Sequence, residues 1–396
     1  AMVASMKKIR SRDDLAINGA SPAFDETLHV GRPNIGSRDD FLEFVGQIFD
    51  RGWLTNNGPM VQEFEKRVSD YHQVKHCIAM CNGTVALEIA IRATGLTGEV
   101  IIPSYTFIAT AHALHWQGIT PVFADIDPVT HNLDPEAVRR MITDRTSGIL
   151  GVHLWGRGAP VVALQEVADD HGLRLLFDAA HAFGCSSSGT MIGNFGDCEV
   201  FSFHATKFFN TFEGGAVLTN NDELAEAMRL MRNFGFAGLD NVVHPGTNGK
   251  MTEICAAMGL VNLDSIDTVI DANKRNYEIY SKELAKLKDI DLLNFDRSER
   301  QNYQYIVVEV AEESAVGRDS IVEALHAENV RARRYFWPGC HKMLPYRTLF
   351  SQAGKELPIT QSVADRVIVL PTGPTMDESM VRAVASIIAT LMEDGG

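Results

Sequence analysis

Lys207 lies in a phenylalanine-rich stretch, FSFHATKFFNTFEGG (residues 201–215). Apolar neighbours keep water away from an amine, and the loss of water favours the neutral, nucleophilic form of that amine. Such a lysine can form a Schiff base with a carbonyl compound. The alternative, which is the commoner fate of a single lysine, is a stem that covers apolar neighbours while the amine stays in water. Other residues must decide between these two interpretations.

A carboxylate ends one of the apolar runs: Asp178 follows LRLLF and precedes AAHAFG. In an open α/β sheet, ligands bind outside the carboxyl ends of the strands, so Asp178 is a candidate ligand-binding group. An apolar strand that ends in Asp also fits a nucleotide hydrolase, but the chain has no G-x-x-x-x-G-K-[ST]. It also lacks G-x-G-x-x-G for a dinucleotide and H-E-x-x-H for zinc, which weakens those alternatives.

The stretch CNGTVALEIA (residues 81–90) predicts a strand end, a turn at Asn82 and Gly83, and a helix that begins near Thr84. Backbone N–H groups at a helix N-terminus bind anions such as phosphate. The alternative is that Thr84 only caps the helix. A lysine, a carboxylate at a strand end and a phosphate site are together the groups that pyridoxal phosphate (PLP) needs, because the carboxylate keeps the pyridine nitrogen protonated.

Composition narrows the class of protein. The net charge of −15 argues against a nucleic-acid partner, which would need a basic face. No apolar stretch approaches the length of a membrane span and no leader-like segment opens the chain, so we expect no membrane partner and a cytoplasmic protein. The six cysteines show no C-x-x-C pair or zinc-type spacing, which predicts reduced thiols and no bound metal. The opening AMVASM indicates a cloning remnant at residues 1–5, ahead of a native start near Met6.

Short apolar runs alternate with helical patterns from about residue 77, which predicts βαβ units and a mainly parallel sheet with helices on both faces. We expect seven strands, in HCIAM, EVIIP, PVFADI, GILGVH, LRLLFD, CEVFSFH and GGAVLT, with a helix near residues 160–171. A long helical pattern follows around residues 252–288. After it, YQYIVVEV, a helix near residues 319–328, VRARRYF, VIVLP and a last helix indicate a second, smaller α/β unit. The predicted division is an N-terminal segment (1–40), a large cofactor-binding domain (41–265) and a small C-terminal domain (266–396).

Six motifs carry a family resemblance: NGTVALEIA, PSYTFIATAHAL, PVFADIDP, FDAAHAFG, FSFHATKFFNTFEGG and GTNGKMTE. From about residue 25 onward, their order and spacing resemble those of the sugar aminotransferases of the DegT/DnrJ/EryC1/StrS family. The resemblance implies an α/β protein with the PLP-dependent transferase fold of type I, as in aspartate aminotransferase. It also implies PLP as the cofactor, pyridoxamine phosphate as an intermediate, and a homodimer with shared active sites.

The resemblance also implies roles for individual residues. Lys207 corresponds to the lysine that binds the cofactor and moves the proton, and Asp178 to the carboxylate that faces the pyridine nitrogen. The other matching positions are His181 near the cofactor's 3′ oxygen, Phe107 stacked on the ring, Gly83, Thr84 and Ser202 at the phosphate, and Asn248 at the phosphate of the neighbouring subunit's cofactor. For Phe107 the alternative is a core side chain on a helix, and for the stretch around Asn248 it is a simple turn.

The segments RGWLTNNGPMVQEFE, GVHLWGR, HATK, YFWPGCH and LPTG look most like those of bacterial dTDP-4-dehydro-6-deoxy-D-glucose 4-aminotransferases. This similarity implies transfer of an amino group from L-glutamate to C4 of a nucleotide-linked 4-keto-6-deoxyhexose, giving dTDP-4-amino-4,6-dideoxy-D-glucose. The alternatives are a GDP-linked aminotransferase of the perosamine type and a 3-aminotransferase. The lysine at position 207 favours transamination over the family's dehydratases, which carry histidine there.

A nucleotide sugar brings a diphosphate, and an acidic protein must offer it local positive charge. The segment NVRARRYFWPGCHKMLPYR supplies candidates for substrate binding, namely Arg331, Arg333, Arg334, His341 and Lys342. The alternative is a solvated strand edge, the usual fate of a run of charges. Cys340 in the same segment could in principle serve a desulfurase-like reaction, but a single Cys in a Pro-Gly turn is more often structural.

The last alternative is a regulator in which an aminotransferase-like domain follows a DNA-binding one. Nothing basic or helix-turn-helix-like precedes residue 40, which favours the enzyme.

Overall fold

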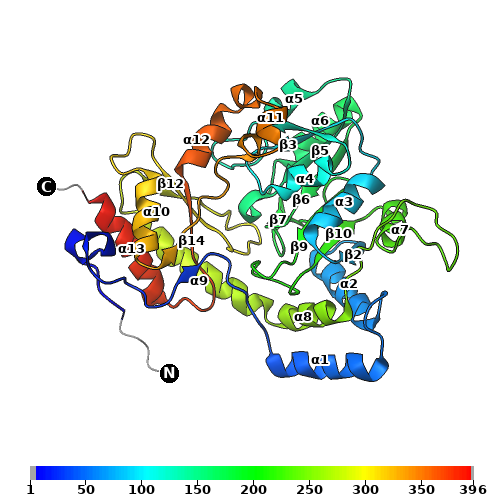
Figure 1. The fold of residues 1–396 in the computed structure, drawn as a ribbon, viewed down its shortest axis with the longest axis horizontal. Coiled ribbons are helices and arrows are strands. Elements are labelled where there is room, and N and C mark those ends of the chain that lie inside the picture. Colours follow the sequence, from blue (N-terminus) through cyan, green and yellow to red (C-terminus); the bar gives the residue numbers. More distant parts are fainter. Residues whose placement is uncertain (1–5, 394–396) are drawn as a thin grey trace.

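The computed structural model describes residues 6–393, so the predicted cloning remnant at residues 1–5 lies outside the described part. A large sheet with its helices lies beside a smaller α/β unit, and both ends of the described chain lie on the smaller side (Figure 1). Within residues 6–393, none of the helices combines the length and the apolar character needed to cross a membrane. The cytoplasmic location stays a prediction.

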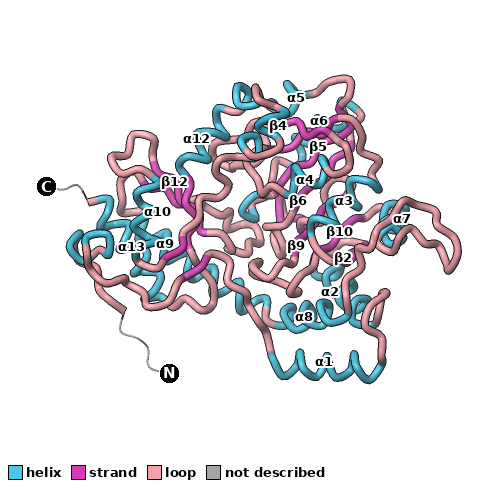
Figure 2. The backbone as a smooth tube through the Cα atoms, viewed as in Figure 1, coloured by secondary structure: helices cyan, strands magenta, loops and turns pink. Residues whose placement is uncertain are grey.

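The large sheet has seven strands in the order β2-β10-β9-β6-β5-β3-β4, and all are parallel except β10, which pairs antiparallel with both neighbours (Figure 2). The strands are β2 (His76–Met80), β3 (Glu99–Pro103), β4 (Thr120–Ala124), β5 (Thr146–Val152), β6 (Arg174–Asp178), β9 (Cys198–Ser202) and β10 (Gly215–Thr219). The predicted count of seven, the strand positions and the mainly parallel arrangement are confirmed.

Side chains of the large sheet alternate between two apolar layers. Ile78 and Met80 of β2 face the layer beneath α3, α4 and α7, whereas Cys77 and Ala79 face the layer formed with α2 and α8. Because successive residues of a strand point to opposite faces, an apolar run without polar interruption is the pattern of a strand buried on both sides. This burial holds the strand ends, and the residues that follow them, in fixed positions.

Helices pack against both faces of the large sheet. They are α1 (Arg38–Arg51), α2 (Pro59–His72), α3 (Gly83–Ala93), α4 (Ala109–His115), α5 (Pro135–Met141), α6 (Val161–His171), α7 (Asp222–Met231) and α8 (Glu253–Asp264). The predicted helix near residues 160–171 is α6. The long helical pattern at residues 252–288 is two helices, because the chain breaks at Ser265 between α8 and α9 (Ile266–Leu284).

The smaller unit contains a three-stranded antiparallel sheet of β11 (Ile290–Leu292), β12 (Ile306–Val310) and β14 (Val367–Leu370). Its helices are α9, α10 (Arg318–Ala327) and α13 (Glu378–Met392), and the short helices α11 (Tyr346–Leu349) and α12 (Pro358–Arg366) lie between it and the large sheet (Figure 1). Two short pairings complete the structure, β1 (Leu28–His29) with β13 (Val330–Arg331) and β7 (Ser186–Ser187) with β8 (Thr190–Met191). Only the first two residues of VRARRYF are therefore in a strand.

Two segments cross the division predicted at residue 265/266, which itself stays a prediction. Leu15 and Phe24 of the N-terminal segment lie in the apolar core of the smaller unit. Conversely, Cys340, Tyr346 and Leu357, far along the C-terminal part, pack into the core of the large sheet. The two units are therefore tied together by more than the connection between α8 and α9.

The N-terminal segment is held by a buried carboxylate. Glu328, which is fully buried, accepts hydrogen bonds from the backbone N–H groups of Ala16 and Ala23, the latter at 2.6 Å. The next residue, Asn329, donates to the carbonyl of Phe24 at 2.7 Å and accepts from the N–H of Leu28 at 2.8 Å. These contacts fix the path of the chain into β1.

We therefore predict that Glu328→Ala lowers the free energy of unfolding by about 2–4 kcal/mol, since two N–H donors lose a charged acceptor. The urea midpoint should fall, and trypsin should cleave residues 7–32 faster than in the parent protein. Glu323→Ala is the matched control and should behave like the parent, because Glu323 is exposed on α10, the helix whose C-terminal cap is Glu328. Equal protease resistance in both variants would contradict the assigned role of Glu328.

Candidate active site

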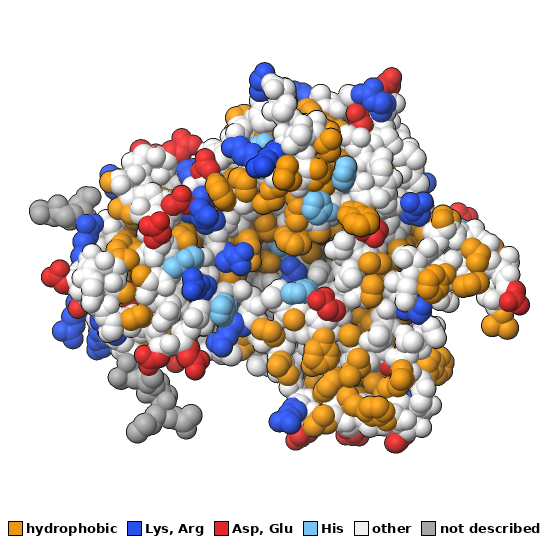
Figure 3. Space-filling model, in the orientation of Figure 1, with side chains coloured by type: hydrophobic (Ala, Val, Ile, Leu, Met, Phe, Trp, Pro, Cys, Tyr) orange, Lys and Arg blue, Asp and Glu red, His pale blue; other side chains and the backbone are white. Residues whose placement is uncertain are grey.

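A cavity of about 690 Å³ lies between the large sheet and the smaller unit. The space-filling view is hollowed at this place, and basic and histidine side chains gather around the opening (Figure 3). The ends of β6 and β9 and the N-terminus of α3 form one wall, and residues of the N-terminal segment and of the smaller unit form the other. This is the position at which ligands bind in open α/β sheets.

Lys207 and Asp178 both line this cavity, as the sequence predicted. Burial lowers the pKa of the Lys207 amine to about 8, although the nearby charge of Asp178 acts in the opposite direction. Burial also raises the pKa of Asp178 above its usual value, against the hydrogen bonds that its carboxylate accepts from Thr110 Oγ1 (2.9 Å) and from the N–H of Ala180 (3.1 Å). The interpretation of Lys207 as a lysine whose amine stays in water does not fit this burial.

A tight turn carries Lys207. Its N–H donates to the carbonyl of His204 at 2.9 Å, and the His204 ring accepts from the N–H of Thr206 at 3.2 Å and lies 2.8 Å from the Thr206 hydroxyl. Gly31 of the N-terminal segment lies against the turn: a Cβ built there would be 3.0 Å from the Thr206 carbonyl oxygen. Its φ of +77° also favours glycine.

The N-terminus of α3 opens into the same cavity, and a helix N-terminus is a candidate anion-binding site. Asn82 caps the helix by accepting from the N–H of Val85 at 2.8 Å, so the interpretation of Thr84 as the cap is wrong. Gly83 is required because a Cβ at this position would approach the Ser202 Cβ to 2.9 Å. The backbone of Gly83 and Thr84 and the side chain of Ser202 therefore come together, as the sequence predicted.

His181 lines the cavity as a neutral ring. Burial holds its pKa well below the usual value, and the charge of Lys207 lowers it further. The N–H of Trp155, a residue with φ of +63°, donates to His181 Nδ1 at 3.1 Å, which leaves the ring proton on Nε2. The rings of Trp155 and Tyr305 lie 5.8 Å and 4.3 Å from the His181 ring and fix its orientation. His181 therefore offers one N–H donor and no charge.

Phe107 lies before α4 rather than within it, and it faces the cavity with 59% of its surface exposed. The interpretation of Phe107 as a core side chain on a helix is therefore wrong. An exposed aromatic ring at the mouth of a cavity can stack on a planar ligand.

Of the basic residues predicted to bind substrate, only Arg333 lines the cavity. Arg334 is instead paired with Asp319 at 3.2 Å and stacks on the Trp337 ring. His341 is buried, and its Nδ1 lies 2.6 Å from Ser104 Oγ, so it helps to dock its segment onto the large sheet. For His341, Arg331, Arg334 and Lys342, the prediction that they face the substrate has no support in the lining of the cavity.

Two further predicted residues lie outside the cavity. Cys340 is buried, and burial raises the pKa of its thiol to about 12, so it has no reactive thiolate at neutral pH. Asn248 lies in a long arm, residues 233–249, that projects beyond α7 (Figure 1), where its side-chain oxygen accepts from Lys250 Nζ at 2.8 Å. Asn248 does not line the cavity of its own chain.

Several residues that line the cavity were not predicted from the sequence: His29, Arg32, Glu213, Gln304, Tyr305 and Tyr335. Glu213 falls within the FSFHATKFFNTFEGG stretch, and its closeness to Lys207 was a usable signal. His29 and Arg32 gave no such signal, because only the pairing of β1 with β13 brings their segment to the cavity.

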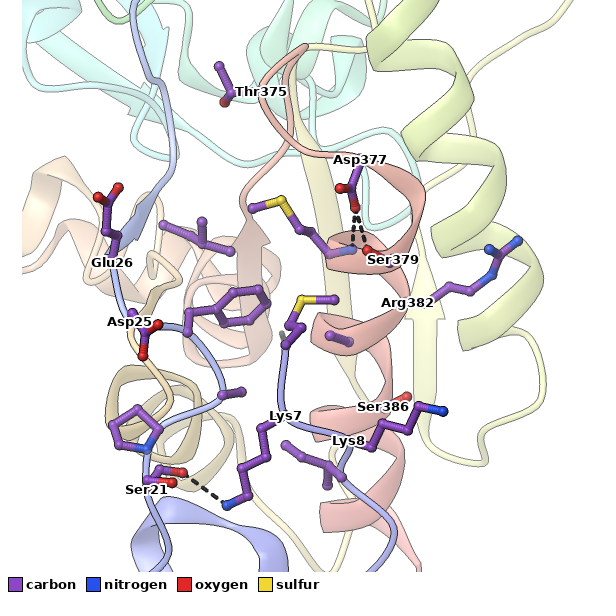
Figure 4. Close-up of a pocket in the computed structure, with 18 of the residues that line it drawn as sticks. Lys7, Lys8, Ser21, Asp25, Glu26, Thr375, Asp377, Ser379, Arg382 and Ser386 are labelled. Carbon is purple, nitrogen blue, oxygen red and sulfur yellow. Dashed lines mark hydrogen bonds between the residues drawn. The ribbon is translucent and has the colours of Figure 1, made fainter. Parts of the chain in front are cut away.

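A second, larger cavity of about 1060 Å³ lies between the N-terminal segment and α13 and shares the lining residue Arg32 with the first. Lys7 donates to the carbonyl of Ser21 at 3.0 Å along its wall, and Asp377 accepts from Ser379 (Figure 4). Arg382 of α13 also lines it. Its charged groups are of both signs, and it contains neither Lys207 nor Asp178, so we assign the chemistry to the first cavity.

The fold and the first cavity are those of an α/β aminotransferase. Residues 37–389 match the model of the DegT/DnrJ/EryC1/StrS aminotransferase family, and the chain belongs to that family. It is 35% identical to the dTDP-4-amino-4,6-dideoxy-D-glucose transaminase of Escherichia coli and 36% identical to the GDP-perosamine synthase of Caulobacter vibrioides, with 92% of this chain and 98% of the relative covered in each case. The crystal structure of DesI in the presence of its TDP-sugar product has a TM-score of 0.92 and 49% sequence identity, covering 97% of both chains. These relatives confirm an enzyme of the sugar-aminotransferase class rather than a regulator.

The low pKa of Lys207 gives a pH dependence with a defined sign. In the cofactor-free protein, only the neutral amine attacks an aldehyde, so the reaction of Lys207 with pyridoxal should rise with pH around a midpoint near 8. Because the Asp178 carboxylate stabilises the ammonium form, Asp178→Asn should move the midpoint below that of the parent. Borohydride reduction and peptide mass analysis would measure modification of Lys207 alone.

Asp222→Asn is the control, since Asp222 is an exposed partner of Lys75 and is not part of the cavity. A midpoint near that of an ordinary lysine, or one that rises in Asp178→Asn, would refute the assigned electrostatics.

Proposed function

We propose that this protein is a PLP-dependent aminotransferase that moves an amino group from L-glutamate to C4 of a nucleotide-linked 4-keto-6-deoxyhexose, with the dTDP-linked sugar as the favoured acceptor. The observation that carries the proposal is the meeting, in one cavity, of a partly buried lysine with a lowered pKa, a buried carboxylate and a helix N-terminus. These residues fit PLP. A side chain at Gly83 would fill the space beside Ser202 where the phosphate would bind. Asp178 is the buried carboxylate among the described residues that line the cavity, whereas Glu213 is exposed.

Each residue has a defined task toward the cofactor. Gly83, Thr84 and Ser202 would bind the phosphate, Asp178 the protonated pyridine nitrogen, and the His181 Nε2–H the 3′ oxygen. Phe107 would cover the ring. When bound, PLP supplies an electron-withdrawing ring and a carbonyl carbon that carries the amino group between the two substrates.

Lys207 would bind the cofactor's carbonyl carbon at rest and move a proton at its Nζ during transfer. A general acid–base works best when its pKa lies near the working pH, and a pKa of about 8 meets that condition. Thr110 and Ala180 keep Asp178 oriented as an acceptor, so the carboxylate can hold the ring proton throughout. The neutral His181 adds no second cation beside Lys207.

The acceptor is inferred from what the relatives are named for. The Escherichia coli relative is named for a dTDP-linked 4-amino sugar, and DesI was solved with its TDP-sugar product at 49% identity. The Caulobacter vibrioides relative is similar to the same degree and is named for a GDP-linked sugar, which supports the perosamine type as the second candidate.

An assay with L-glutamate and dTDP-, UDP- and GDP-linked 4-keto-6-deoxy sugars tests the proposal. We expect the dTDP-linked acceptor to give the highest kcat/KM, and NMR of the product to place the amino group at C4. Lys207→Ala should lower turnover about 1000-fold or more, because the same amine binds the cofactor and moves the proton. Visible absorbance of the bound cofactor should change in parallel.

Lys282→Ala is the matched control, since Lys282 is exposed on α9 and does not line the cavity. Preference for the GDP-linked sugar would establish the second candidate, amination at C3 would correct the regiochemistry, and full turnover by Lys207→Ala would refute the mechanism.

We infer further that the protein works as a homodimer with shared sites. The projecting arm carries exposed apolar side chains, among them Phe234, Leu239, Val242 and Val243. Leu42 and Phe49 of α1 and Ile254 of α8 are also exposed, and apolar side chains gather over this part of the surface in Figure 3. Exposed apolar groups in this number favour burial against a second copy. An arm that reaches the neighbouring cavity would bring Asn248 to the phosphate there.

Mixing two impaired variants tests the shared site. Lys207→Ala damages a site in its own chain, whereas Asn248→Ala would damage the site of the partner. In a hybrid dimer, one site then carries both substitutions and the other carries neither. Random mixing should restore about one quarter of the parent activity at limiting PLP. No recovery after verified subunit exchange would show that each chain has a self-contained site.

A further inference from the structure

We propose that Arg32 and Arg333 together bind the diphosphate of the nucleotide sugar, a role for Arg32 that the sequence motifs do not suggest. The inference rests on the proposed function and assigns one ligand group of that same cavity. Both residues line the cavity, and both are exposed. Across residues 6–393, neither guanidinium has a hydrogen-bond or ion-pair partner; that of Arg333 lies over the Tyr335 ring at 4.7 Å.

The backbone explains how two residues 301 positions apart reach one cavity. Strands β1 and β13 are parallel, with His29 opposite Arg331, so the two segments of the chain leave the pair in the same direction. Arg32 is three residues beyond the pair and Arg333 two. With a rise of about 3.3 Å per residue, each Cα lies within about 10 Å of the end of the pair.

Both segments are anchored beyond the pair. Arg333 exchanges backbone hydrogen bonds with Val369 of β14, at 3.0 and 2.8 Å. Gly31 packs against Thr206, the residue before Lys207, so the segment that carries Arg32 crosses beside the turn of the catalytic lysine. The backbone at both arginines is therefore fixed, and each exposed guanidinium can reach the cavity that it lines.

Charge and chemistry favour a diphosphate as the ligand. The phosphate of PLP would be bound on the opposite wall, where Gly83, Thr84 and Ser202 supply neutral donors. A diphosphate presents several oxygens with a charge of about −2. It therefore matches two planar guanidinium groups, which are always charged, better than a single carboxylate of the amino donor does. In a chain with a net charge of −15, two unpaired guanidinium groups in one cavity are a marked local excess of positive charge. The two carboxylates that line the cavity have other partners: Glu213 lies 3.6 Å from His204, and Asp178 accepts from Thr110 at 2.9 Å.

Calorimetric titration of the holoenzyme with dTDP and with thymidine tests the proposal. Arg32→Ala and Arg333→Ala should each weaken dTDP binding about 10- to 100-fold and leave thymidine binding unchanged. Arg32→Lys keeps the charge but loses the fork, so it should bind with intermediate affinity. Arg382→Ala is the matched control: it removes an arginine that shares the second cavity with Arg32 but does not line the first.

The outcomes separate this proposal from the proposed function. Unchanged dTDP affinity in Arg32→Ala, or an equal loss for dTDP and thymidine, overturns the diphosphate site even if the enzyme aminates the dTDP-linked sugar. A slower half-reaction with L-glutamate, with dTDP binding intact, also overturns it and assigns Arg32 to the donor carboxylate. Selective loss of dTDP binding supports the site even if a different keto sugar proves to be the acceptor.

Discussion

The burial of one amine beside one carboxylate is the constraint on which the active site depends. Apolar surroundings act against the charged forms of both Lys207 and Asp178, and each group partly offsets this cost for the other. Such a pair persists only where further donors satisfy the carboxylate and where the backbone on both sides is fixed. Thr110 and Ala180 supply the donors, and the His204 turn fixes the lysine.

A second buried pair, below the cavity, holds the strand that ends in Asp178. His153 Nε2 lies 2.6 Å from Glu199 Oε1, and Glu199 also accepts from the N–H of Phe195 at 3.0 Å. The N–H of His153 donates to the carbonyl of Asp178 at 3.1 Å. Since β5, β6 and β9 are neighbours in the sheet, this network ties the carboxyl ends of β5 and β6 to the beginning of β9. The site is therefore positioned by the most deeply buried part of the fold.

The residues at the ends of the buried strands could be predicted from the sequence, whereas those brought to the cavity by long-range pairing could not. The seven strands were predictable because strands buried on both faces are continuous apolar runs, and Lys207, Asp178 and Gly83 were predictable because they end or follow such runs. The place of Arg32 in the cavity was not predictable, since a two-residue pairing with a segment 302 positions away leaves no local sequence pattern. The cluster from Arg331 to His341 was ambiguous for a related reason: a run of charges does not say which member finds a partner. Arg334 found Asp319, His341 found Ser104, and only Arg333 was left facing the cavity.

The two walls of the cavity thus differ in how firmly the rest of the fold fixes them. The proposed chemistry lies at the ends of a seven-stranded sheet buried on both faces, where a shift of one residue would turn every side chain of a strand toward the opposite apolar layer. In the proposed function, recognition of the substrate would come from segments joined by two-residue pairings and a glycine contact, which can change without disturbing that sheet. Relatives named for dTDP-linked and for GDP-linked sugars are similar to this chain to nearly the same degree, at 35% and 36% identity. Under the two proposals, the ends of the sheet would hold the cofactor, and the wall that carries Arg32 and Arg333 would contact the diphosphate of the substrate.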